Sequence, residues 1–213
     1  MTERYRSEHI IQSTEQLRAL YGEPSQKSLS KELDHVSPAY QRFIEAAPFA
    51  VLASIGPAGV DTSPRGDPAG FVRVVDAQTL MLPDRMGNNR ADTLLNIVRD
   101  GRVSMLFLIP GIGETLRVIG AAEVVVDPQL LAQFVTSAGQ GSKTPRSVVV
   151  IHVQKVFFQC QKAIARSKLW QAESHVPRDQ VPSAGQMLAA VDSEFDGDSY
   201  DKNYAQHMAQ TIY

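Results

Sequence analysis

The apolar and polar positions along the chain predict a middle region made mainly of strands. Runs rich in Val, Ile, Leu or Phe are mostly bounded by Gly, Pro or Asp, which is typical of strands. They read FAVLASIG, GFVRVVD, TLMLP, RVSMLFLIP, TLRVIGAAEVVVD and SVVVIHVQKVFFQC. We therefore expect at least six strands. Because helices do not alternate regularly with them, an antiparallel barrel that carries helices is favoured over a doubly wound parallel sheet.

Two helices are predicted before the strands. Ser13 can cap a helix that ends at Gly22, and Ser37 can cap a second that stops before Pro48. After Trp170 the chain turns polar and predicts one or two surface helices.

Two further helices interrupt the strands. Asp127 can cap one that closes at Gly139. The other follows Asn89, and its apolar residues recur with helical spacing, which predicts one face packed against the sheet: Ala91, Leu94, Leu95 and Val98.

This pattern divides the chain into three parts. Residues 1–48 form an N-terminal helical extension, residues 49–170 the strand-rich domain, and residues 171–213 a C-terminal helical extension. A chain of 213 residues is long enough for one sizeable core with appendages.

Composition excludes several classes of function. A formal net charge of -2 argues against a general nucleic-acid binder, because such affinity comes largely from clustered Lys and Arg. The single cysteine, Cys160, rules out an internal disulfide framework, and the five scattered histidines disfavour a metal site. No signal peptide or run of roughly 20 apolar residues is present, so we expect a cytoplasmic protein that does not enter membranes.

The stretch LMLPDRMGNNRADTLLNI, Leu80 to Ile97, is the strongest candidate for a site. A strand leads into a bend at Gly87 and then into a helix start, whose unpaired amides and positive dipole favour an anion. A basic first turn opposes the dipole unless an anion neutralises it. The polar residues gathered there are Asp84, Arg85, Asn88, Asn89 and Arg90. Alternatively, Asn88 or Asn89 only caps the helix and both arginines lie in solvent.

A second cluster, DTSPRGDP, follows the first predicted hairpin. Ser63 and Arg65 could give a hydroxyl and a guanidinium to a phosphate. The alternative is a surface loop in which Arg65 pairs with Asp61 or Asp67.

Two later segments carry weaker signals. Thr115 and Arg117 alternate along a strand and share one face, which is open either to a ligand or to solvent. Arg166 and Trp170 lie in CQKAIARSKLW, where the Trp could flank an aromatic ring or serve in packing.

The order of these parts resembles the pyridoxamine 5'-phosphate oxidase-like FMN-binding split-barrel superfamily, and more narrowly its uncharacterised FMN-dependent branch. FAVLASIGPAGVDTSPRGD and the segment from TLMLPDRMGNNR to VIGAAEV carry the resemblance, which covers roughly residues 49–170. It implies a six-stranded antiparallel split barrel. It also implies a homodimer with FMN in each of two clefts at the subunit interface.

The resemblance also implies roles for individual residues at the acidic end of the flavin. By position, Asn89 and Arg90 match the phosphate-binding turn and would contact the phosphate or ribityl chain, while Arg65 would add charge.

Other matched positions would lie near the isoalloxazine. Pro83 and Asp84 would lie close to it, and Thr115 stands where the oxidases use a glutamine. Arg166 and Trp170 resemble C-terminal contacts that come from the other subunit.

Two departures argue against vitamin B6 phosphate oxidation. The first arginine strand reads RGDPAG without the oxidases' lysine, and Lys168 stands where they carry a histidine. The resemblance therefore implies an FMN-dependent oxidoreductase with an unidentified small substrate and NAD(P)H or oxygen as partner. The alternatives are a protein that stores or senses flavin, and a split barrel that uses deazaflavin or haem.

Overall fold

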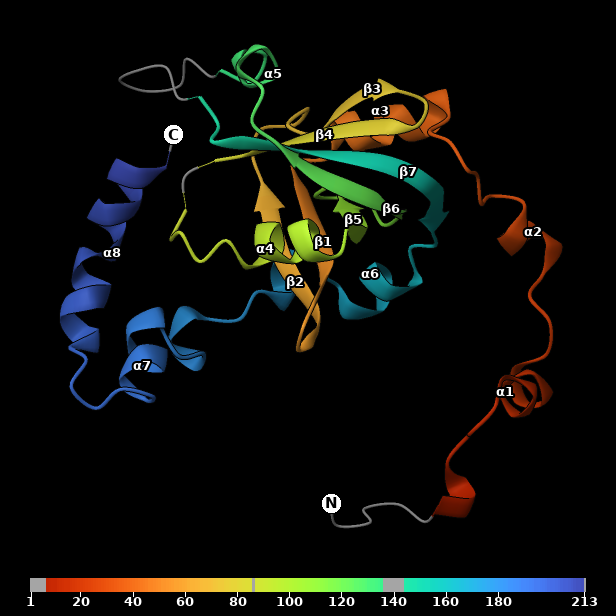
Figure 1. Cartoon of the computed structure of the whole chain (residues 1–213). Helices are drawn as coiled ribbons and strands as arrows, with labels where there is room; N and C mark the ends of the chain where they lie inside the picture. The colour runs from red at the N-terminus through yellow and green to blue at the C-terminus, as the bar shows by residue number, and fades with distance from the viewer. Residues whose placement is uncertain (1–6, 86, 136–143, 213) are drawn as a thin grey trace.

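The fold is a seven-stranded antiparallel sheet with helices around it, as a computed structural model describes for residues 7–85, 87–135 and 144–212 (Figure 1). The strand order is β2-β1-β5-β6-β7-β4-β3, so β2 and β3 are open edges. The strands are β1 (Phe49–Gly56), β2 (Gly59–Gly66), β3 (Arg73–Asp76), β4 (Thr79–Asp84), β5 (Arg102–Leu108), β6 (Thr115–Val125) and β7 (Ser147–Gln159). The predicted class, mainly β with flanking helices, is confirmed.

The sheet has seven strands rather than the six of the expected antiparallel split barrel, and it is not closed. The additional strand is β2, which is not among the six apolar runs that predict strands and whose sequence, GVDTSPRG, is largely polar. Proline is tolerated on an edge strand, where one side of the backbone needs no partner. Pro64 pairs with Val51 of β1 on that edge, so the polar cluster lies on a strand.

The helices before the sheet begin where their caps predict. α1 (Thr14–Tyr21) follows Ser13, whose Oγ accepts from the Gln16 amide, and it ends at Gly22 in a left-handed conformation. α3 (Pro38–Ala46) follows Ser37, as predicted, and Ile44 places it against the core. The 3-10 helix η1 (Ser7–His9) and the short α2 (Gln26–Leu29) complete this region.

The helix α4 (Asp92–Arg99) buries a different face from the predicted one. Thr93, Asn96 and Ile97 lie inside, whereas Leu95 and Val98 are 48% and 76% exposed. Asn96 faces inward because its Nδ2 donates to the buried Ser54 Oγ at 3.1 Å. Of the four residues predicted to face the sheet, Leu94 is half-buried against the core, and Ala91 precedes the helix.

Two later helices are short. Asp127 caps α5 (Pro128–Ala132) as predicted, but the helix ends before Gln133, and the predicted end at Gly139 lies outside the described residues. The segment with Arg166 forms α6 (Lys162–Ser167), and Trp170 follows this helix.

The main core lies between the sheet and the helices α3 and α4. Its fully buried side chains include Phe107 of β5, Leu116 of β6 and Leu80 of β4, which come from strands on both halves of the sheet. A smaller cluster around Phe134 packs α5 and its following turn against Val148 of β7. Burial of this apolar surface is the main force that fixes the strand order.

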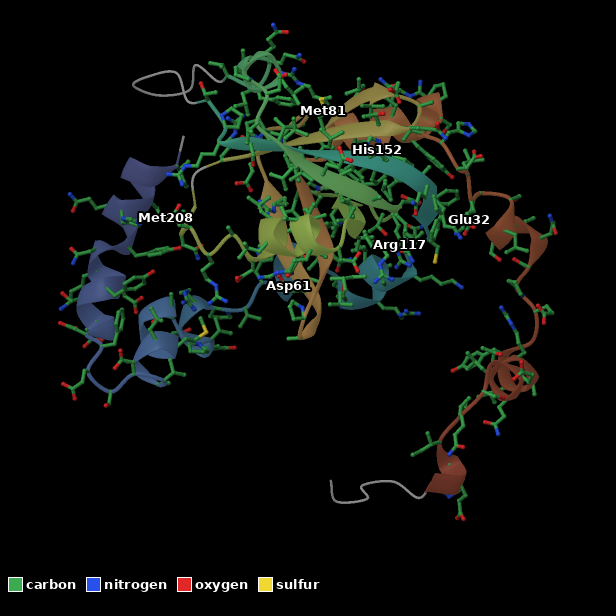
Figure 2. The ribbon with its side chains drawn as sticks, viewed as in Figure 1. Glu32, Asp61, Met81, Arg117, His152 and Met208 are labelled. Atoms are coloured by element: carbon green, nitrogen blue, oxygen red, sulfur yellow. The ribbon has the colours of Figure 1, made fainter. Side chains whose placement is uncertain are left out.

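The two terminal regions extend away from the sheet in Figure 1, and Met208 of α8 is labelled on the outlying C-terminal helix in Figure 2. The 3-10 helices η2 (Ala172–Ser174) and η3 (Arg178–Gln180) lead to α7 (Ala184–Ala189) and α8 (Gly197–Thr211). These two helices cross closely at Gly185 and Gly197, where a Cβ on Gly185 would lie 2.2 Å from the Gly197 oxygen. None of the described helices combines the length and apolar character that crossing a bilayer requires.

We expect Asn96→Ala to lower the free energy of unfolding by about 1–3 kcal/mol, because the buried Ser54 hydroxyl loses its partner. Urea unfolding of the variant measures this change. The control Arg99→Ala, on the exposed side of the same helix, should stay within about 0.5 kcal/mol of the parent. Equal stability of the two variants would contradict a role for the Asn96–Ser54 hydrogen bond.

Candidate functional site

A cavity of about 640 Å³ brings together four chain segments: β2, the end of β4 with its following loop, the start of α4 and the start of β7. Its volume lies in the range of ordinary ligand pockets. The described lining consists of Asp61, Thr62, Ser63, Pro64, Arg65, Asp84, Arg85, Gly87, Asn88, Asn89, Arg90, Ala91, Asp92, Thr93, Leu94, Arg146 and Ser147. The first two predicted clusters therefore meet in one place.

Asp84 connects three of these segments. Its carboxylate accepts from Arg65 Nη1 of β2 at 2.7 Å, and its backbone oxygen accepts from the Arg146 amide at 3.0 Å. Asp84 also pairs with Ser147 across β4 and β7. Both charged side chains are largely buried, so Arg65 pairs with neither Asp61 nor Asp67, the partners considered in the alternative.

A second buried ion pair joins Arg85 of the lining to Asp67, which lies outside it. Arg85 Nε donates to Asp67 Oδ2 at 2.9 Å, and each side chain is only 10% exposed. Arg85 Nη1 also donates to the Phe134 oxygen at 3.3 Å. The Arg85 side chain is therefore buried and paired. This outcome differs from the alternative in which both arginines of the loop lie in solvent.

The loop from Asn88 to Ala91 is shaped by two left-handed residues. Asn89 and Ala91 have φ of 62° and 55°, so the bend lies there, whereas Gly87 has no positive φ. Asn88 Oδ1 accepts from the Arg90 amide at 3.1 Å. Ala91 occupies the N-cap position of α4 and provides no side-chain cap, so neither Asn88 nor Asn89 caps the helix. The first amides of α4 are thus available to an anion.

Arg90 lies beside the helix start but already has a carboxylate partner. Its Nε donates to Asp92 Oδ2 at 2.8 Å, and its side chain is 75% exposed. The hydrogen bond to Asp92 raises the pKa of Arg90, and the charges of Asp92 and Asp61 act in the same direction. The unfavourable position of Arg90 near the dipole is therefore partly compensated within the chain.

The start of β7 supplies a wall that the sequence did not predict. Arg146 Nη1 donates to Asn89 Oδ1 at 2.8 Å, and Ser147 is 5% exposed. The Ser147 Oγ and the Arg65 Nε are buried without a hydrogen-bond partner among the described residues. Buried polar atoms normally have partners, so these two indicate a bound polar group. Arg146 stands alone before an apolar run, which gives no local signal of its role.

Seven of the predicted site residues line the cavity: Ser63, Arg65, Asp84, Arg85, Asn88, Asn89 and Arg90. Pro83 is buried in β4 opposite Val148 and does not line it. The binding roles of all these residues stay predictions.

The other predicted residues lie toward the opposite end of β6 and β7. Thr115 pairs with Gln159, and both Thr115 and Arg117 approach the Gln159 Oε1 at 3.5 Å. Because β7 has 13 residues, roughly 40 Å of strand separates Gln159 from the cavity at Ser147. Figure 2 accordingly labels Arg117 near α6 and away from Asp61.

Arg166 and Trp170 are also outside the cavity. Arg166 is exposed on α6, and Trp170 Nε1 donates to the Ile112 oxygen at 2.7 Å, which ties the segment after α6 to the turn before β6. Both stay predictions as flavin contacts, and one chain alone does not bring them to the cavity.

No group of three or more His, Cys, Asp or Glu side chains among the described residues is arranged to hold a metal ion. The ionisable lining of the cavity consists of Arg and Asp. This donor set suits a phosphate and polar ligand groups better than a transition metal.

Comparison with known proteins assigns the chain to a family. Residues 36–160 match the sequence model of the family described as Pyridoxamine 5'-phosphate oxidase. This match spans more than half of the chain, which therefore belongs to that family, and the predicted resemblance is confirmed. The search of curated proteins found no match.

Several solved structures are similar in part. HupZ from Group A Streptococcus shares 19% identity over 59% of this chain and 94% of that chain, with a TM-score of 0.48. A conserved hypothetical protein from Mycobacterium tuberculosis shares 19% over 71% and 96%, with a TM-score of 0.44. An F420 reductase shares 20% over 58% and 98%, with a TM-score of 0.41.

We expect Asp67→Ala to lower the free energy of unfolding by about 3 kcal/mol, because it leaves the Arg85 charge buried without its carboxylate. The matched control Asp92→Ala removes an exposed pair and should change it by less than about 1 kcal/mol. Thermal and urea unfolding of both variants measure the difference. Similar losses in the two variants would show that burial of the Arg85–Asp67 pair has no energetic effect.

Proposed function

We propose that the cavity binds FMN and that the protein is an FMN-dependent oxidoreductase acting on a small substrate. One observation carries this proposal: a loop rich in Asn and Arg, an uncapped helix start and the partnerless Ser147 hydroxyl surround a single cavity. Membership of the pyridoxamine 5'-phosphate oxidase family supports the same ligand.

The residues present fit a flavin mononucleotide. Asn88, Asn89 and Arg90 with the first amides of α4 would hold the phosphate, because amide donors and a helix start favour an anion. Ser63 and the buried Ser147 Oγ would hydrogen-bond polar atoms of the ligand. The partnerless Arg65 Nε supports the same conclusion, since a bound acceptor would satisfy it.

Bound FMN supplies the redox centre, since the isoalloxazine accepts and donates electrons. The described lining contains no His, Cys, Lys or Tyr that could act as a general acid or base near neutral pH. We therefore assign this chain's residues to binding and orientation. The Arg65–Asp84 pair holds β2 against β4, which fixes the walls around the ligand before it arrives.

A homodimer would complete the site. Leu95 and Val98 are exposed on α4, the helix whose start lines the cavity, which leaves an apolar surface for a second copy. Thr115, Arg166 and Trp170 lie far along the sheet from their own cavity, so a second copy could bring the equivalent residues to it. NAD(P)H or oxygen would serve as the electron partner.

Purified protein should carry FMN, with flavin absorption and a released ligand of the mass of FMN. Anaerobic addition of NAD(P)H should bleach this absorption, and a substrate or oxygen should restore it. Flavin that binds but is reduced by neither NADH nor NADPH, nor by any other electron donor in a screen, would indicate a storage or sensing protein. Release of a deazaflavin or haem, or absence of FMN binding in a titration, would refute the proposal.

Light scattering after gel filtration should give a mass twice the 23.4 kDa of one chain. Val98→Asp should shift the protein toward the monomer, because a charge would be buried on the α4 surface. The control Val75→Asp, on the exposed edge strand β3, should leave the mass unchanged. A monomeric parent protein would contradict the dimer without affecting the test for FMN.

A further inference from the structure

We propose that Arg146 is the residue that recognises the phosphate of the ligand, so that the preference for FMN over unphosphorylated riboflavin depends mainly on it. This inference rests on the proposed function. It assigns the principal charge of the phosphate site to the residue that directly precedes β7, a segment that carries none of the residues predicted from sequence.

The argument begins with the charge balance of the cavity. Of the four arginines in its lining, three have carboxylate partners: Arg65 with Asp84 at 2.7 Å, Arg85 with Asp67 at 2.9 Å and Arg90 with Asp92 at 2.8 Å. A guanidinium paired in this way presents little net charge to a ligand, because the carboxylate repels the same anion that the guanidinium attracts.

Arg90 illustrates this limit. Asp92 hydrogen-bonds it, and Asp61, also in the lining, acts on its charge as well. A phosphate that approached Arg90 would therefore meet two carboxylates near the same cation. Arg90 would contribute a hydrogen-bond donor, but little of the net attraction.

Arg146 differs from the other three. Among the described residues its guanidinium has one hydrogen-bond partner, the neutral Asn89 Oδ1 at 2.8 Å, and no ion pair. Its backbone is fixed by the bond from its amide to the Asp84 oxygen. Arg146 thus places an uncompensated positive charge on the cavity wall, beside the loop that leads to the uncapped start of α4.

Ser147 gives an independent indication that a ligand belongs at this wall. Its side chain is more than nine-tenths buried, lines the cavity and has no hydrogen-bond partner for Oγ among the described residues. A bound acceptor next to Arg146 would satisfy this hydroxyl. The hydrogen bond from Arg146 to the neutral Asn89 oxygen would then give way to an ion pair with the phosphate, which adds the attraction between opposite charges.

The test compares FMN with riboflavin, which differ only by the phosphate. Dissociation constants of both flavins are measured for the full chain, stripped of flavin, by quenching of flavin fluorescence. The parent protein should bind FMN more tightly than riboflavin. Arg146→Ala should reduce this preference by about 10- to 100-fold, the effect of one lost charge-assisted hydrogen bond, and should leave riboflavin binding within about threefold.

Three variants serve as comparisons. Arg146→Lys should retain part of the preference, because it keeps the charge but not the guanidinium geometry. Arg90→Ala should reduce it less than Arg146→Ala. Arg99→Ala removes an exposed arginine at the far end of α4 and should leave the preference unchanged.

Each result decides the matter. A preserved preference in Arg146→Ala, or an equal loss for both flavins, overturns the role of Arg146 while leaving FMN binding established. A larger loss in Arg90→Ala than in Arg146→Ala overturns it as well. Binding of neither flavin by the parent protein overturns the proposed function and this assignment together.

Discussion

The cavity depends on one aspartate that joins separate parts of the chain. Asp84 ends β4, accepts from Arg65 of β2 through its side chain and from the Arg146 amide through its backbone. β2 and β4 lie on opposite sides of the sheet order, so no ladder of hydrogen bonds holds them together. A largely buried ion pair does so instead, and its orientation is fixed because the guanidinium and the carboxylate each restrict the other. Without this contact, nothing would fix the distance between the loop at Asn89 and the strand that carries Ser63.

Local signals in the sequence predicted most of the fold. Ser13, Ser37 and Asp127 cap helices because a side-chain oxygen needs only the next three residues to find its amide. Failures arose where distant partners decide the outcome. Asn96 is buried because Ser54, 42 residues away, accepts its hydrogen bond, and a helical pattern of apolar residues cannot show this. β2 was missed because GVDTSPRG has no apolar run, and it is a strand because it lies at the edge of the sheet, a place that depends on the order of all the strands.

The candidate site follows the same division. The loop at Asn88, Asn89 and Arg90 was recognisable because its polar residues stand directly between a strand and a helix. Arg146 was not, since its place beside Asn89 requires β7 to pair with β4 after a separation of 57 residues. The carboxylate partners of the arginines were likewise hidden: sequence alone shows Arg65 near Asp61 and Asp67, yet the fold selects Asp84. Counting basic residues in a motif therefore overstates the charge that a ligand meets.

The open sheet also bears on how this chain avoids associating with itself in unwanted ways. An unpaired strand edge can recruit another chain and start aggregation. β2 carries Pro64, which lacks an amide hydrogen, and β3 has only four residues with an irregular register between Val74 and Asp76. Both margins are thus poor templates for strand addition. Pro64 thus protects the folded molecule, because it denies an incoming strand one of the hydrogen bonds needed to extend the sheet.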